Sequence, residues 1–172
     1  MHNIVLTGMM GSGKSSVAKE LAKCLPEFNL VELDDEIEKC ENLKISEIFE
    51  QKGEEYFRTQ ETLLLKKYAK NENQIISLGG GAFIKDENRQ VLKDDFTVYL
   101  SAASETIFSR IKNDNSRPLL KNNVSITKIQ EIINKRESFY KLAKYEIKTD
   151  NKTTEQIAKE ITEKYEKIKR KN

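Results

Sequence analysis

The sequence predicts an α/β protein in which a five-stranded parallel sheet is sandwiched between layers of helices. Two observations support this fold class. Short apolar strand patterns alternate with helical patterns along the 172 residues, which is typical of a parallel sheet covered by helices. In addition, Gly8–Ser15 joins the first strand pattern to the first helical pattern and matches the phosphate-binding sequence G-x-x-x-x-G-K-[ST]. The length predicts one domain, residues 1–172.

The glycine-rich segment is a P-loop in the context that a P-loop requires. The apolar run Ile4–Leu6 precedes it, and Val17 and Leu21 follow at helical spacing. Its glycines let backbone N–H groups approach phosphate oxygens closely, and the helix N-terminus adds partial positive charge. Lys14 is predicted to reach the β- and γ-phosphates, and the Ser15 hydroxyl to bind Mg²⁺. The segment therefore predicts binding of a nucleoside triphosphate such as ATP.

The remaining elements follow in order. The strands are predicted at Asn3–Thr7, Asn29–Leu33, Gln74–Leu78, Phe96–Leu100 and Tyr145–Thr149. Leu25-Pro26 ends the first helix. A longer helix is predicted over 54–70, with Phe57, Glu61, Leu64 and Tyr68 on one face. Ile129, Ile132, Ile133 and Phe139 indicate another helix. The last begins at Thr153, which forms a capping box with Gln156.

Composition excludes several classes of function. The 30 basic and 28 acidic residues nearly balance, which argues against a nucleic-acid or membrane partner. The sequence has no apolar stretch of membrane-spanning length. Cys24 and Cys40 lack metal-ligand spacing and are expected to be reduced thiols in a cytoplasmic protein. Cys24 also falls on the apolar stripe of the first helix, which predicts a core position.

Two segments interrupt the regular alternation. Residues 34–53 form two short helical patterns between the second strand and the long helix. Residues 113–123 are polar and turn-rich, with helices on both sides, which predicts a lid over the triphosphate.

Two acidic residues end the second strand, at the edge where an open parallel sheet binds ligands. Strand alternation places Glu32 and Asp34 on the same side. One carboxylate could serve Mg²⁺ while the other accepts a hydrogen bond from an acceptor hydroxyl. Alternatively, Asp34 or Asp35 could cap the following helix.

Glycines and arginines complete the candidate site. Gly79–Gly81 follows an apolar strand and permits close approach to a ligand, or forms a tight turn. Arginine offers a planar fork for carboxylate or phosphate, although a single surface arginine is more often solvated. The candidates, which stand out in a Lys-rich chain, are Arg58, Arg110, Arg117 and Arg136.

Taken together, these motifs resemble the shikimate kinase family. The resemblance spans nearly the whole chain and agrees in order and spacing. It is carried by Gly8–Ser16, Leu33–Glu38, Gly53–Arg58, Ser77–Gly81, Arg117–Leu120, and Lys135-Arg136 followed by Tyr140.

The resemblance implies transfer of the γ-phosphoryl group of ATP to the 3-hydroxyl of shikimate, with Mg²⁺, in the chorismate pathway. It also implies the strand order 2-3-1-4-5, a substrate-binding insertion at 34–61, a lid at 112–124 and a monomer. For the substrate, Asp34 is implied as the base or orienting group, Arg58 and Arg136 as the carboxylate clamp, and Gly80 as a backbone contact. For ATP, the implied residues are Gly11, Ser12, Gly13, Lys14, Ser15, Ser16, Arg110 at the adenine and Arg117 in the lid.

The chain departs from the family pattern in two places. Many members carry Asp where this chain has Glu32, so the firm metal assignment is Ser15 alone. The loop 150–154 also lacks a proline that some members place beside the adenine. A gluconate kinase is the nearest rival enzyme, since gluconate also offers a carboxylate and hydroxyls. An ATP-binding regulator of a partner protein is the rival from another class.

Overall fold

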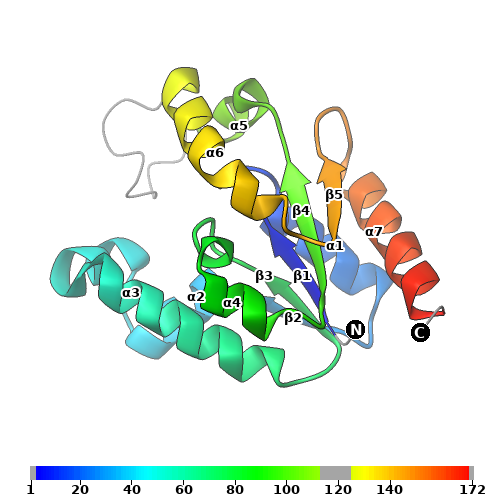
Figure 1. Ribbon diagram of the computed structural model, residues 1–172, viewed down its shortest axis with the longest axis horizontal. Coiled ribbons are helices and arrows are strands. Elements are labelled where there is room, and N and C mark those ends of the chain that lie inside the picture. Colours follow the sequence, from blue (N-terminus) through cyan, green and yellow to red (C-terminus); the bar gives the residue numbers. More distant parts are fainter. Residues whose placement is uncertain (1–2, 113–124, 171–172) are drawn as a thin grey trace.

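The structure, a computed structural model, describes residues 3–112 and 125–170 (Figure 1). Its sheet contains five parallel strands in the order β2-β3-β1-β4-β5, which confirms the predicted fold class and strand order. Each strand lies within one residue of its predicted bounds. The strands are β1 (Ile4–Thr7), β2 (Asn29–Glu32), β3 (Gln74–Ser77), β4 (Phe96–Ser101) and β5 (Tyr145–Lys148).

Helices connect the strands in the described parts of the chain. They are α1 (Lys14–Cys24), α2 (Leu33–Glu41), α3 (Ile45–Ala69), α4 (Asp86–Val91), α5 (Ser104–Ile111), α6 (Ile126–Tyr140) and α7 (Thr154–Lys169), with a 3-10 turn η1 at Ala82–Ile84. The predicted capping box of Thr153 and Gln156 starts α7. No bounds were predicted for η1, α4 and α5, because each is too short to establish a clear helical period.

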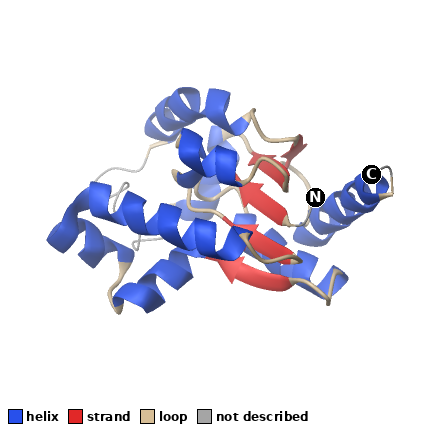
Figure 2. Ribbon diagram, turned by 60° about the horizontal axis from the view of Figure 1, so that its bottom comes forward, coloured by secondary structure: helices blue, strands red, loops and turns tan. Residues whose placement is uncertain are grey.

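The core has two parts, one on each face of the sheet. Ile4 and Leu6 of β1 pack with α1 and α7, whereas Val5 between them packs with the opposite layer. This follows from the two-residue alternation of side chains along a strand. Figures 1 and 2 show α7 at one side of the sheet, and α3, α4 and α6 at the other. The arrangement is the predicted three-layer sandwich.

One core prediction is wrong. Cys24 is exposed, although it continues the apolar stripe of the first helix. The helix ends at Cys24, and the chain then turns so that Leu25, which is 6% exposed, packs into the core instead. The buried face of α1 is therefore Val17, Ala18 and Leu21.

The segment between β2 and β3 carries the predicted pair of short helices, but the second runs into the long helix. Helix α3 is broken at Gly53, whose φ of 84° and ψ of 166° lie in a region open essentially to glycine alone. The break allows the first part of α3 to change direction before the long second part packs on the sheet. Among the described residues, no helix is long and apolar enough to cross a membrane.

Candidate active site

Two clefts meet at the carboxyl end of the parallel strands. The first, of 590 Å³, is lined by α2, α3, the glycine turn after β3 and Arg136 of α6. The second, of 660 Å³, is lined by the P-loop, Glu32 and the loop after β5. Met10, Asp34 and Gly80 line both clefts, so these residues mark the boundary between them. This edge contains the point where the strand order reverses around β1, the usual ligand position in an open α/β sheet.

The P-loop forms the floor of the second cleft. Gly13, with a φ of 100°, occupies the N-cap position of α1, which begins at Lys14. The Lys14 ammonium donates hydrogen bonds to the carbonyl oxygens of Gly8 and Met9, at 2.9 and 3.0 Å. These bonds curl the side chain back over the loop, so its charge lies within the phosphate-binding loop. The cleft lining includes all of Gly11, Ser12, Gly13, Lys14, Ser15 and Ser16.

Ser15 and Glu32 face each other across this cleft. The Ser15 hydroxyl donates to Oε2 of Glu32 at 3.0 Å, while Oε1 of Glu32 is buried and has no hydrogen-bond partner among the described residues. A hydroxyl and a carboxylate are ligands suited to Mg²⁺, which takes one or two protein oxygens and completes its shell with water and phosphate. The described residues contain no cluster of three or more His, Cys, Asp or Glu side chains that could hold a metal. The donor set therefore fits a phosphate-bound Mg²⁺ rather than a metal held by protein alone.

Arg110 joins the P-loop to the loop after β5. Its Nη1 donates to the Gly11 carbonyl at 3.3 Å and to Thr149 Oγ1 at 3.2 Å, and its Nη2 donates to the Thr149 carbonyl at 3.3 Å. The guanidinium thus lines the second cleft at the side away from Asp34 and braces two of its walls. This place is compatible with contact to the base of a nucleotide.

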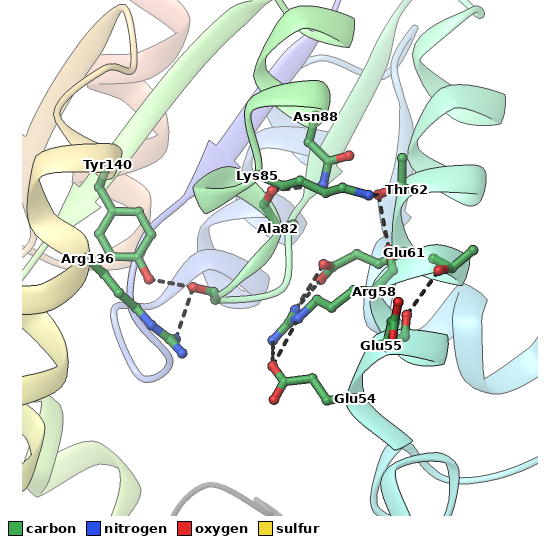
Figure 3. Close-up of polar contacts among 12 residues, drawn as sticks. Glu54, Glu55, Arg58, Glu61, Thr62, Ala82, Lys85, Asn88, Arg136 and Tyr140 are labelled. Carbon is green, nitrogen blue, oxygen red and sulfur yellow. Dashed lines mark hydrogen bonds and ion pairs between the residues drawn. The ribbon is translucent and has the colours of Figure 1, made fainter. Parts of the chain in front are cut away.

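Arg58 lies in the first cleft between two carboxylates of α3 (Figure 3). Its Nη1 donates to both Glu61 oxygens, at 2.9 and 3.1 Å, and its Nε and Nη2 donate to Glu54 at 3.3 and 3.2 Å. The guanidinium also covers Gly81 so closely that a Cβ there would lie 2.5 Å from Nη2. A side chain at this position of the turn would therefore displace the Arg58 guanidinium from its present place.

Glu61 is a buried carboxylate, only 1% exposed. Burial raises its pKa to about 7; the Arg58 guanidinium opposes this shift, and the nearby Asp34 carboxylate adds to it. Asp34 and Glu61 approach the same glycine, because a Cβ on Gly79 would lie 2.7 Å from Asp34 Oδ1 and 2.8 Å from Glu61 Oε1. The first cleft thus places two acidic groups and an arginine around bare backbone.

Arg136 enters the same cleft from α6. Its Nη1 donates to the Gly80 carbonyl at 3.3 Å, and the Tyr140 hydroxyl donates to the same oxygen. Figure 3 shows Arg58 and Arg136 extending from α3 and α6 toward the space between these helices. Two guanidinium groups from separate elements, which are groups suited to binding carboxylates, therefore line the same cleft.

An apolar wall completes the first cleft. The rings of Phe49 and Phe57 pack with their centroids 4.9 Å apart, and Ile45 and Met10 add to the lining. A cleft with an apolar wall, two arginines and acceptors for hydroxyls suits a compact carboxylic acid that has one apolar ring face and several hydroxyl groups.

The structure brings together most of the predicted site residues, with two changes. Asp34 lies in the first turn of α2 and not on a strand with Glu32, because β2 ends at Glu32. The capping alternative is wrong, since Glu32 and neither aspartate holds the N-cap position. Asp34, Arg58, Gly80 and Arg136 all line the first cleft. Arg117 and lid residues 113–124 lie outside the described residues.

Glu61 and Tyr140 are among the residues at the site that received no role from the sequence. Glu61 was predicted only as part of a helix face, and Tyr140 only as part of a motif. The signal for Glu61 was present, because a charged residue between Phe57 and Leu64 on an apolar stripe must find a partner when buried. Arg58, three residues earlier, supplies it. The bond from Tyr140 to Gly80 joins residues too distant in sequence for any local pattern to indicate.

Comparisons with known proteins agree with this geometry. A family model described as shikimate kinase matches residues 10–166. The shikimate kinase of Persephonella marina is 44% identical over 162 residues, which cover 94% of this chain and 97% of the relative. The shikimate kinase of Thermodesulfovibrio yellowstonii is 41% identical over 169 residues, covering 98% of this chain and 97% of the relative.

A solved structure gives the same result. The shikimate kinase of Acinetobacter baumannii, determined in complex with shikimate, superposes with a TM-score of 0.92 at 33% identity. The match covers 98% of this chain and 95% of that one. Family model, sequence relatives and structure agree over nearly the whole chain, so this protein belongs to the shikimate kinase family.

Proposed function

We propose that this protein transfers the γ-phosphoryl group of ATP to the 3-hydroxyl of shikimate, giving shikimate 3-phosphate and ADP. The observation that carries the proposal is the position of Asp34, which lines both clefts. An acceptor hydroxyl beside Asp34 would face a triphosphate held by the P-loop. The shared boundary supplies the alignment on which phosphoryl transfer chiefly depends.

Acceptor recognition is assigned to the first cleft. Arg58 and Arg136 bind the shikimate carboxylate, and the Phe49–Phe57 wall covers the apolar face of the ring. Gly80 lets the backbone approach the ring hydroxyls. An acyclic acid such as gluconate has no ring face to pack on this wall, so the cleft favours shikimate over gluconate.

Asp34 is assigned the acceptor hydroxyl. Its carboxylate accepts the hydrogen bond from that hydroxyl, orients the oxygen toward the γ-phosphorus and receives the proton as the new O–P bond forms. The bond from the γ-phosphorus to the β–γ bridging oxygen breaks, and the leaving oxygen remains on ADP.

Nucleotide recognition is assigned to the second cleft. Backbone N–H groups of the P-loop and the Lys14 ammonium bind the phosphates, Arg110 contacts the adenine, and Arg117 stabilises charge on the transferring group. Ser15 and Glu32 would be the protein ligands for Mg²⁺. The ion, when bound, neutralises charge on the β- and γ-phosphate oxygens. The protein is proposed to act as a monomer in the cytoplasm, on the pathway to chorismate.

The test is ADP release from Mg·ATP by the purified full chain, with shikimate, with gluconate and without an acceptor. We expect shikimate-dependent ADP formation that a chelator abolishes and added Mg²⁺ restores. Arg58→Ala should raise the KM for shikimate by roughly 10- to 100-fold, because it removes charge-assisted hydrogen bonds to the carboxylate. Arg170→Ala, at the exposed end of α7, is the matched control and should behave as wild type. Preferential turnover of gluconate, or binding of ATP without any acceptor-dependent turnover, would overturn the proposal.

A further inference from the structure

Tyr140 is held rigidly at the end of α6. Its side chain is 1% exposed, and its ring packs on Tyr99 of β4 with centroids 5.2 Å apart and planes 29° from parallel. The ring is therefore fixed between a helix and the sheet. Only its hydroxyl is directed out of the hydrophobic core, toward the glycine turn that follows β3.

That hydroxyl donates a hydrogen bond to the Gly80 carbonyl oxygen at 2.5 Å. Burial raises the pKa of Tyr140, so the hydroxyl keeps its proton at neutral pH and donates. Arg136 lies one helical turn earlier on the same face, and its Nη1 donates to the same oxygen over the longer distance of 3.3 Å. One carbonyl of the turn thus accepts two hydrogen bonds from adjacent turns of α6 (Figure 3).

The orientation of this carbonyl matters because Gly80 lines both clefts. The turn also lies close to the P-loop, since a Cβ on Gly80 would be 3.5 Å from the Met10 nitrogen and 3.7 Å from the Gly8 oxygen. Three consecutive glycines restrict the backbone very little by themselves. The bond from a rigid tyrosine supplies a restraint that the turn's own sequence does not.

We infer that Tyr140 is a positioning residue of the acceptor site, whose hydroxyl holds the Gly80 carbonyl and leaves the Arg136 guanidinium available for the substrate carboxylate. The inference rests on the proposed function, because it assigns that carboxylate to Arg136. With the hydroxyl in place, the Gly80 carbonyl keeps a donor when Arg136 turns to the substrate carboxylate. Without the hydroxyl, Arg136 is the remaining side-chain donor among the described residues, so the substrate competes with the carbonyl for the same guanidinium. The nucleotide phosphates, held by the P-loop, are unaffected by this competition.

The test compares Tyr140→Phe with wild type in steady-state kinetics and thermal unfolding. The variant removes one oxygen and keeps the ring that packs on Tyr99. We expect the KM for shikimate to rise roughly three- to tenfold, the cost of one lost buried hydrogen bond. The KM for Mg·ATP should change by less than about twofold, because the variant weakens the binding of shikimate and leaves the nucleotide contacts intact. Tyr165→Phe is the matched control. Tyr165 is also buried, at 3% exposure, but it packs from α7 into the core on the other face of the sheet and lines neither cleft.

The outcomes separate the possibilities. An increased KM for shikimate alone, absent from Tyr165→Phe, supports the inference. An unchanged KM for shikimate overturns it, as does an equal rise of both KM values together with a fall in melting temperature, which indicates a merely structural role. Failure of the proposed function appears differently, because the wild-type protein itself would then show no turnover with shikimate.

Discussion

Burial of the Glu61 carboxylate costs free energy of folding that an apolar side chain at the same position would not cost. A carboxylate that is 1% exposed has lost its hydration, and its hydrogen bonds to Arg58 replace that hydration only in part. The pKa of Glu61 is raised to about 7 because the hydration lost on burial is not fully replaced. Compared with its ordinary value of 4.5, the shift corresponds to about 3 kcal/mol in favour of the neutral form. In return for this cost, Glu61 holds the Arg58 guanidinium in place at the acceptor cleft.

This shift predicts the sign of a pH effect on stability. The folded state binds a proton at Glu61 up to about pH 7, whereas the unfolded chain releases it above 4.5, so this residue makes stability fall as pH rises through that window. In Glu61→Gln this pH-dependent contribution to the free energy of unfolding disappears, because the amide does not titrate. The free energy of unfolding of the variant should therefore improve relative to wild type between pH 5 and 7, by at most about 1.4 kcal/mol per pH unit. Urea unfolding at successive pH values measures it, and parallel curves for the two proteins would contradict the assignment.

At the scale of elements, α3 is two helices with different tasks. The part before Gly53 contributes Ile45 and Phe49 to the acceptor cleft, and the part after it contributes Phe57, Arg58 and Glu61. A continuous straight helix would direct these two groups along one axis. The break at Gly53 allows both to line the same cleft.

The break predicts the effect of Gly53→Ala. A Cβ at this position meets no atom of residues 3–112 and 125–170 within 4 Å, so the expected penalty comes from the backbone conformation and not from a clash. The expected loss is about 1 to 3 kcal/mol of folding free energy, the usual cost of a non-glycine residue in this region of φ and ψ. Glu55→Ala, an exposed position just beyond the break, is the control. Equal urea midpoints for the two variants would show that the break does not depend on glycine.

Sequence reasoning succeeded for elements whose signals are local. The five strands and the long helices were predicted because apolar periodicity and capping residues lie within single segments. Sequence reasoning failed where the position of a side chain depends on the residue at which a helix begins or ends. Cys24 fits the apolar stripe, but the helix stops there, and Asp34 fits strand alternation, but α2 begins at Leu33.

The site likewise contains a part that a local pattern predicts and a part that only tertiary contacts specify. The P-loop is contiguous and was evident from its pattern, whereas the functional grouping of Arg58, Gly80 and Arg136 was implied only by family resemblance. Contacts such as that between Tyr140 and Gly80 depend on how α6 packs against the turn after β3. Only the tertiary structure specifies such contacts.

At the scale of the whole molecule, the parallel sheet brings loops from distant parts of the sequence to one edge. The turn after β1 holds phosphate-binding groups, the chain after β2 supplies Asp34, and the turn after β3 supplies Gly80. Because β1 lies beside β3 and β3 beside β2, these three loops are neighbours. Two clefts with a common boundary are the consequence, and the catalytic proposal rests on that boundary.

The most direct test of this account is the turnover of Asp34→Asn at saturating Mg·ATP and shikimate, with the binding of each ligand measured by calorimetry. The substitution keeps the size of the side chain but removes the acceptor of the hydroxyl proton. Turnover should fall by roughly 10²- to 10⁴-fold while both affinities change only a few-fold. Asp94→Asn, at an exposed position that lines neither cleft, should remain close to wild type. Wild-type turnover in Asp34→Asn would contradict the central claim that phosphoryl transfer occurs at the boundary marked by Asp34.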